Sequence, residues 1–162
     1  MTTAPQPVAI IPARAGSKGL PGKNTRLLAG KPLYRHSVDR ALASGIKRVI
    51  ISTDIADIFT HDLPDEVELF QRPPKLAGDA VTMAEMLRNL LPQANLTNHT
   101  IVLMQPTSPL RTTQTVQRAL TLYRKTPTCS LLMSVSEAER SVLKWGTLKD
   151  NRFIPLSSPD YC

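Results

Sequence analysis

The residues best suited to chemistry lie between positions 8 and 24. A short apolar run, residues 8–11, is followed by a segment that holds three glycines, Ser17 and the cations Arg14, Lys18 and Lys23. Such a run predicts a buried strand, and glycines let the following backbone approach an anion closely. No Asp or Glu precedes Asp39, whereas six Lys or Arg do. The pattern predicts a site for phosphate.

The spacing of this segment excludes two common phosphate motifs. Five residues separate Gly16 from Gly22, where a P-loop has four, and Asn24 follows Lys23 where a P-loop has Ser or Thr. No G-x-G-x-x-G dinucleotide fingerprint is present. A basic surface turn after the first strand is the remaining structural alternative.

Four blocks of sequence resemble a known family. The longest is IPARAGSKGLPGKN at 11–24, continued by GKPL at 30–33; STD at 52–54 and LMQPTSPLR at 103–111 follow in order. A weaker block holds Arg72, Pro73, Leu76 and Asp79. Over residues 8–144 the chain resembles the sugar-acid cytidylyltransferases, and best of all the acylneuraminate (CMP-sialic acid) synthetases.

The resemblance implies that the anomeric hydroxyl of a sialic-acid-like sugar attacks the α-phosphate of CTP and releases pyrophosphate. It implies catalytic roles for Lys23 and Arg14 and sugar contacts for Gln105 and Lys144. The nucleotide-binding residues that it implies are Ala13, Arg14, Ser17, Lys23, Asn24, Arg72, Asp79 and Thr82.

Several of these residues could instead have a purely structural role. Arg72 precedes two prolines and is equally consistent with a side chain that faces solvent. Thr82 and Glu85 have the spacing of a capping box, which competes with a nucleotide role for Thr82. Gln105 begins a segment that also fits a rigid turn before a helix capped by Thr112 or Thr113.

The resemblance also implies a bound Mg²⁺. In full-length members of the family, an Asp-x-Asp motif in the C-terminal third of the chain normally holds this ion. No D-x-D occurs in this chain, and Asp54 and Asp57 are not interpreted as a metal site. We therefore expect a C-terminally truncated enzyme of impaired activity. The alternatives are a CTP-binding module without turnover and a structural remnant whose exposed sheet edge is paired by a second copy.

Composition narrows the class of protein. The chain has 162 residues, 41% of them hydrophobic, and a net charge of +7, which predicts one folded domain over 1–162 and an anionic ligand. Aromatic residues make up only 4%, so nucleic acid is not the expected partner. Two cysteines, no membrane span and no signal peptide favour a cytoplasmic protein without membrane contact. A homodimer is left open.

Alternating apolar runs and helical periods predict an α/β fold. We expect strands at 8–12, 49–52, 66–70, 101–104 and 130–135, and helices at 32–43, 55–59, after Thr82 and at 113–123. This order predicts a Rossmann-like three-layer α/β/α architecture with a mainly parallel sheet, of the nucleotide-diphospho-sugar transferase type and incomplete at the C-terminus. Ligands bind beyond the carboxyl ends of such strands, where Arg14, Asp54, Arg72 and Gln105 are expected.

Overall fold

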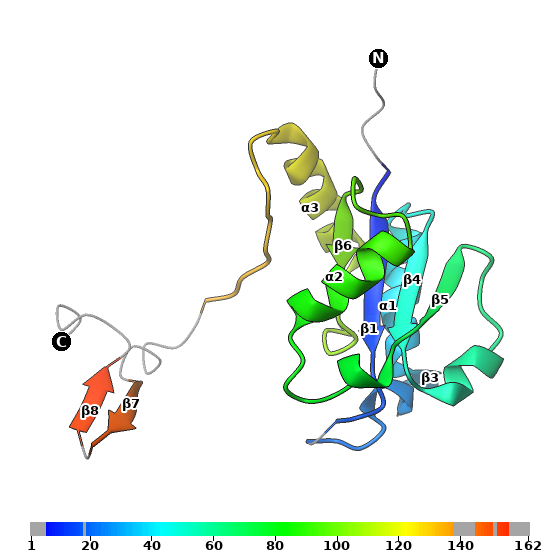
Figure 1. Ribbon diagram of the computed structural model, residues 1–162. Helices are drawn as coiled ribbons and strands as arrows, with labels where there is room; N and C mark the ends of the chain where they lie inside the picture. The colour runs from blue at the N-terminus through cyan, green and yellow to red at the C-terminus, as the bar shows by residue number, and fades with distance from the viewer. Residues whose placement is uncertain (1–5, 18, 138–144, 151, 156–162) are drawn as a thin grey trace. The chain divides into compact units, whose positions relative to one another are not determined.

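The computed structural model describes residues 6–17, 19–137, 145–150 and 152–155. It divides into two compact units, Met1–Thr126 and Pro127–Cys162. The first unit contains a four-stranded parallel sheet with helices on both faces, and the second contains a two-stranded hairpin (Figure 1). Each unit is described by itself.

The sheet of the first unit is built from the apolar runs of the sequence. Its strands are β1 (Val8–Ala13), β4 (Val49–Thr53), β5 (Val67–Gln71) and β6 (Ile101–Leu103), in the order β5-β4-β1-β6. All three pairs are parallel, so the carboxyl ends of the four strands meet at one edge of the sheet. Four of the five expected strands are confirmed.

Successive side chains of β1 point to opposite faces of the sheet and enter two separate cores. Ile11 and its alternate neighbours pack with α1 (Leu33–Ala43) and α3 (Thr113–Lys125), and Ile10 packs with α2 (Met83–Gln93). Both isoleucines are fully buried. Figure 1 shows α2 on one face of the sheet and α1 on the other. A run buried on both faces is typical of a parallel sheet, and the three-layer prediction is confirmed.

The helices begin where the sequence predicts them. They are α1 (Leu33–Ala43), α2 (Met83–Gln93) and α3 (Thr113–Lys125), with short 3₁₀ turns η1 (Lys23–Thr25), η2 (Ala56–Thr60) and η3 (Pro74–Leu76). Thr112 caps α3 by accepting a hydrogen bond from the Thr115 amide. Within the described ranges no helix has the length and apolarity needed to cross a bilayer.

Two short hairpins were not predicted. One joins β2 (Leu27–Leu28) to β3 (Lys31–Pro32) through Ala29 and Gly30, both at positive φ. The other pairs β7 (Gly146–Lys149) with β8 (Arg152–Pro155) in the second unit. Both are antiparallel, and two-residue turns of this kind favour residues that tolerate positive φ.

The prediction of a fifth strand at 130–135 is wrong. These residues form no strand in the structure, and Leu131, Met133 and Val135 are 70, 68 and 88% exposed. An extended segment becomes a strand only when a neighbour completes its backbone hydrogen bonds, and no described strand pairs with it. The segment has the alternating apolar side chains of a strand, but this alternation does not provide a neighbouring strand for its backbone to pair with.

The N-terminus of α2 gives a testable dependence of stability on pH. The Thr82 amide and hydroxyl donate to Glu85 Oε2 at 2.7 and 2.8 Å, and the Glu85 amide donates back to Thr82 Oγ1. The backbone bond from Thr82 lowers the pKa of Glu85 below its ordinary 4.5. The folded protein therefore binds this proton less readily than the unfolded chain, so the stabilisation is present above pH 4.5 and is lost as pH falls through the folded pKa.

We expect Glu85→Gln to lower the urea midpoint of unfolding at neutral pH and to converge with the wild type in acid. If the difference in urea midpoint between the two proteins stayed constant from neutral pH into acid, the assigned role of the Glu85 carboxylate at the helix N-terminus would be contradicted.

Candidate functional site

A cavity of about 250 Å³ opens where the carboxyl ends of the strands meet. It is bounded by four parts of the chain that lie apart in the sequence: the loop after β1, the residue after β5, the segment 76–83 with the next turn of α2, and the start of the loop after β6. The lining residues are Pro12, Arg14, Gly16, Ser17, Lys23, Asn24, Arg72, Leu76, Gly78, Val81, Thr82, Met83, Met86, Gln105, Pro106 and Thr107. Seven of the residues expected at the site are in this set.

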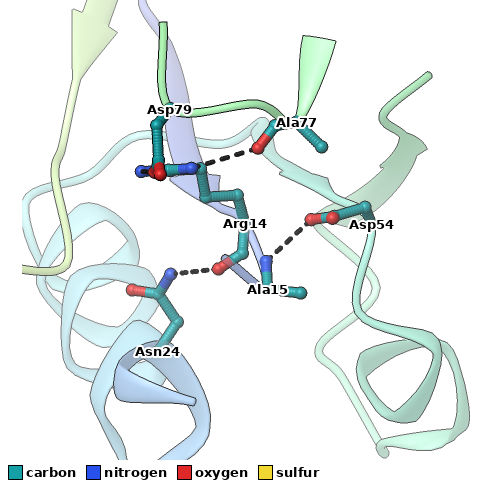
Figure 2. A network of polar contacts seen from close by, with 6 residues as sticks. All are labelled: Arg14, Ala15, Asn24, Asp54, Ala77 and Asp79. Atoms are coloured by element: carbon teal, nitrogen blue, oxygen red, sulfur yellow. Dashed lines mark hydrogen bonds and ion pairs between the residues drawn. The ribbon is translucent and has the colours of Figure 1, made fainter. Parts of the chain in front are cut away.

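The loop after β1, residues 14–24 and here called the cationic loop, is fixed through its backbone. The buried Asn24 donates from Nδ2 to the carbonyl oxygen of Arg14 at 2.8 Å. The next amide, that of Ala15, donates to Asp54 Oδ1 at 2.8 Å (Figure 2). The peptide bond between Arg14 and Ala15 is therefore fixed by hydrogen bonds at both its carbonyl oxygen and its N–H group. The Ala15 amide thus already has an acceptor.

The guanidinium of Arg14 is held by two acceptors from the segment 76–83. Nη1 donates to the carbonyl of Ala77 at 3.1 Å, and Nη2 donates to Asp79 Oδ1 at 2.6 Å (Figure 2). A Cβ at Gly16 would lie 3.3 Å from Nη1, tighter than most such contacts. Glycine at 16 therefore leaves room for this placement of Arg14.

Lys23 and Ser17 line the cavity beside Arg14 and are half-buried. Lys23 begins η1, directly after Gly22, whose φ of 63° turns the chain into the cavity rim. Among the residues that the structure describes, Lys23 forms no ion pair, so its ammonium is available to an anion. Lys18 lies outside the described residues.

Arg72 is buried rather than solvent-facing. Its side chain is 5% exposed and donates from Nε to Ser52 Oγ at 3.2 Å and from Nη2 to the Ser52 carbonyl at 3.0 Å. Burial lowers the pKa of Arg72, and the nearby charge of Asp54 opposes that shift. The arginine therefore carries a buried positive charge between the ends of β4 and β5, at the wall of the cavity.

Thr82 and Gln105 line the cavity, and their polar groups already form some hydrogen bonds within the protein. The Thr82 hydroxyl already donates to and accepts from Glu85, as the capping-box alternative predicts. The Gln105 amide oxygen accepts from Thr107 Oγ1 at 3.4 Å, and the Gln105 side chain is exposed. Gln105 is therefore free to adjust toward a ligand, whereas Thr82 would have to give up part of its cap.

Three expected site residues are not part of the lining. Ala13 is fully buried at the end of β1, and Asp79 is exposed and hydrogen-bonded to Arg14. Lys144 falls outside the described residues.

The apolar part of the lining was missed from the sequence. The spacing of Met83 and Met86 on the apolar face of α2 is typical of core residues, and Met86 does pack in the core under α2. Both also line the cavity, because the first turn of α2 begins at its wall. Their position directly after the Thr82 cap was the available signal.

The carboxylates of the site do not fit a protein-bound magnesium ion. Within the described ranges no three His, Cys, Asp or Glu side chains come together as ligands. Asp54 accepts from the Ala15 amide and Asp79 pairs with Arg14, so both are already engaged. Neither carboxylate is therefore placed to hold a metal ion, and the expected Mg²⁺ stays a prediction.

Comparison with known proteins gives consistent matches. A family model described as Cytidylyltransferase matches residues 8–152. The chain is 36% identical over 151 residues to N-acylneuraminate cytidylyltransferase of Streptococcus agalactiae serotype III, a match that covers 91% of this chain and 36% of the relative. It is 40% identical over 129 residues to CMP-N,N'-diacetyllegionaminic acid synthase of Legionella pneumophila, covering 74% of this chain and 53% of that protein.

A solved structure has the same fold. CMP:2-keto-3-deoxy-manno-octonic acid synthetase complexed with CTP superposes with a TM-score of 0.58 and 25% sequence identity, covering 75% of this chain and 48% of that one. The chain thus spans about a third to a half of the length of these three proteins.

Proposed function

Because the chain belongs to the cytidylyltransferase family, we propose that it binds CTP in this cavity and transfers CMP to a sugar acid of the sialic-acid type. The observation that carries the proposal is the cationic loop at the carboxyl end of β1. It presents Arg14 and Lys23 to a cavity that also contains Gln105. The matched relatives are named for this reaction on N-acylneuraminate and on a legionaminic acid derivative.

The triphosphate lies along the cationic loop. Lys23 neutralises charge on the transferred phosphoryl group, Arg14 binds a phosphate oxygen through its remaining N–H groups, and Ser17 donates a hydroxyl. Phosphoryl transfer needs alignment and charge neutralisation more than covalent help, so cations of this kind supply its main requirement.

The base and the sugar occupy different walls. The apolar side chains of the segment 76–83, Met83 included, suit the face of a pyrimidine ring, which is an apolar surface. Gln105 and Lys144 remain the proposed sugar contacts. The sugar hydroxyl oxygen forms a bond to the α-phosphorus as the bond from that phosphorus to the oxygen bridging to the β-phosphate breaks. The hydroxyl proton passes to solvent, and pyrophosphate leaves.

A second candidate function is CTP binding without turnover. It is favoured by the position of the cavity. All of its lining residues that the structure describes belong to Met1–Thr126, so the proposed CTP site is formed within one unit.

Two measurements separate these functions. Isothermal titration calorimetry is expected to give a binding heat with CTP, and a weaker one with ATP or GTP because a purine is larger than the pyrimidine. Pyrophosphate release with CTP, Mg²⁺ and N-acetylneuraminate is expected for the transferase and not for the binding module. No binding heat with CTP would contradict both functions.

A further inference from the structure

Asp79 is the carboxylate closest to the phosphate-binding arginine, yet it does not line the cavity. We propose that Asp79 is a positioning residue that orients Arg14 for the triphosphate and does not itself contact the nucleotide. The inference rests on the proposed CTP site.

The geometry around Arg14 supplies the first step. A guanidinium has five N–H donors in a fixed plane, and two acceptors on different nitrogens fix the orientation of that plane. The Ala77 carbonyl and the Asp79 carboxylate provide one acceptor to each Nη. The side chain of Arg14 is 30% exposed, so it still presents donors to solvent and to a ligand.

Charge supplies the second step. A carboxylate in direct contact with a triphosphate is repelled by it, which argues against a direct role for Asp79 in holding phosphate. Paired with Arg14 at 2.6 Å, the same carboxylate attracts the arginine and restricts its rotamers. An arginine ordered before binding loses less entropy when the ligand arrives.

The position of Asp79 in the chain supplies the third step. The segment 76–83 forms the apolar wall opposite the cationic loop, and the Arg14 contacts tie this wall to that loop across 63 and 65 residues of sequence. Loss of the Asp79 contact therefore frees Arg14 and also loosens the spacing between the two walls.

A double-mutant cycle tests the proposal with the Kd for CTP as its readout. Asp79→Ala is expected to weaken CTP binding about tenfold, whereas Asp79→Asn, which keeps an oxygen acceptor for Arg14, is expected to weaken it only about twofold. In the Arg14→Ala protein, adding Asp79→Ala is expected to change the Kd little, since the residue through which Asp79 acts is gone. Asp65→Ala, which removes an exposed carboxylate before β5, is the matched control and should bind as the wild type does.

A CMP titration separates orientation of Arg14 from general damage to the site. CMP lacks the outer phosphates, so its Kd should respond less to Asp79→Ala than that of CTP. Equal losses for Asp79→Ala in the wild-type and Arg14→Ala proteins would overturn the proposal, as would an Asp79→Ala protein that binds CTP as tightly as the wild type or more tightly. A wild-type protein that gives no CTP heat would instead overturn the proposed function on which the inference rests.

Discussion

The Lys23→Ala protein is expected to bind CTP about 10- to 100-fold more weakly than the wild type while keeping its fold. Lys23 is half-buried at the cavity rim, and removing a charged hydrogen-bond donor from a phosphate typically costs about 1.5–3 kcal/mol. If the chain turns over, kcat should fall as well, because the ammonium stabilises charge that develops in the transition state. Calorimetry with CTP and the rate of pyrophosphate release measure the two effects.

Lys47→Ala is the matched control for Lys23. Lys47 is an exposed lysine just before β4, at the amino-terminal edge of the sheet and away from the cavity. Its removal makes the same change in net charge and should leave CTP affinity within about twofold. Equal affinities of the Lys23→Ala and wild-type proteins would remove this lysine from the site.

The second large effect is on stability. Replacing Arg72 with methionine is expected to lower the free energy of unfolding by about 2–4 kcal/mol. Methionine approximates the length of the side chain but leaves the Ser52 carbonyl and hydroxyl without their donors at a buried position. Urea unfolding followed by circular dichroism measures the change.

An exposed arginine provides the comparison for Arg72. Arg88→Met on α2 removes the same charge without disturbing a buried bond, so its urea midpoint should stay close to that of the wild type. An Arg72→Met protein as stable as Arg88→Met would show that the Ser52 contacts contribute little to folding.

The sequence predicted the strands and helices that are determined by residues close together in the chain. The run from Val8 to Ile11 is apolar at every position, which a strand buried on both faces requires, and the Thr82–Glu85 spacing marked the start of α2. Strand-end positions for Arg14 and Arg72 followed from parallel topology, since the carboxyl ends of parallel strands share one edge.

The sequence could not predict the features whose cause is not local. The Arg14–Asp79 pair joins segments 65 residues apart, and no short-range spacing signals it. The sequence around Arg72 fits a solvent-exposed position equally well, because its burial depends on the Ser52 carbonyl of a neighbouring strand. Residues 130–135 have the alternation of a strand, but pairing depends on a partner that alternation does not reveal.

The long sequence separation of the Arg14 contacts also bears on the order of events during synthesis. The cationic loop leaves the ribosome early, but the acceptors that orient its arginine are translated 63 and 65 residues later. A nascent chain that ends before the segment 76–83 thus has the glycines and lysines of the loop without a formed binding site. Under the proposed function, nucleotide recognition is therefore expected of the assembled sheet and not of a peptide copied from the loop alone.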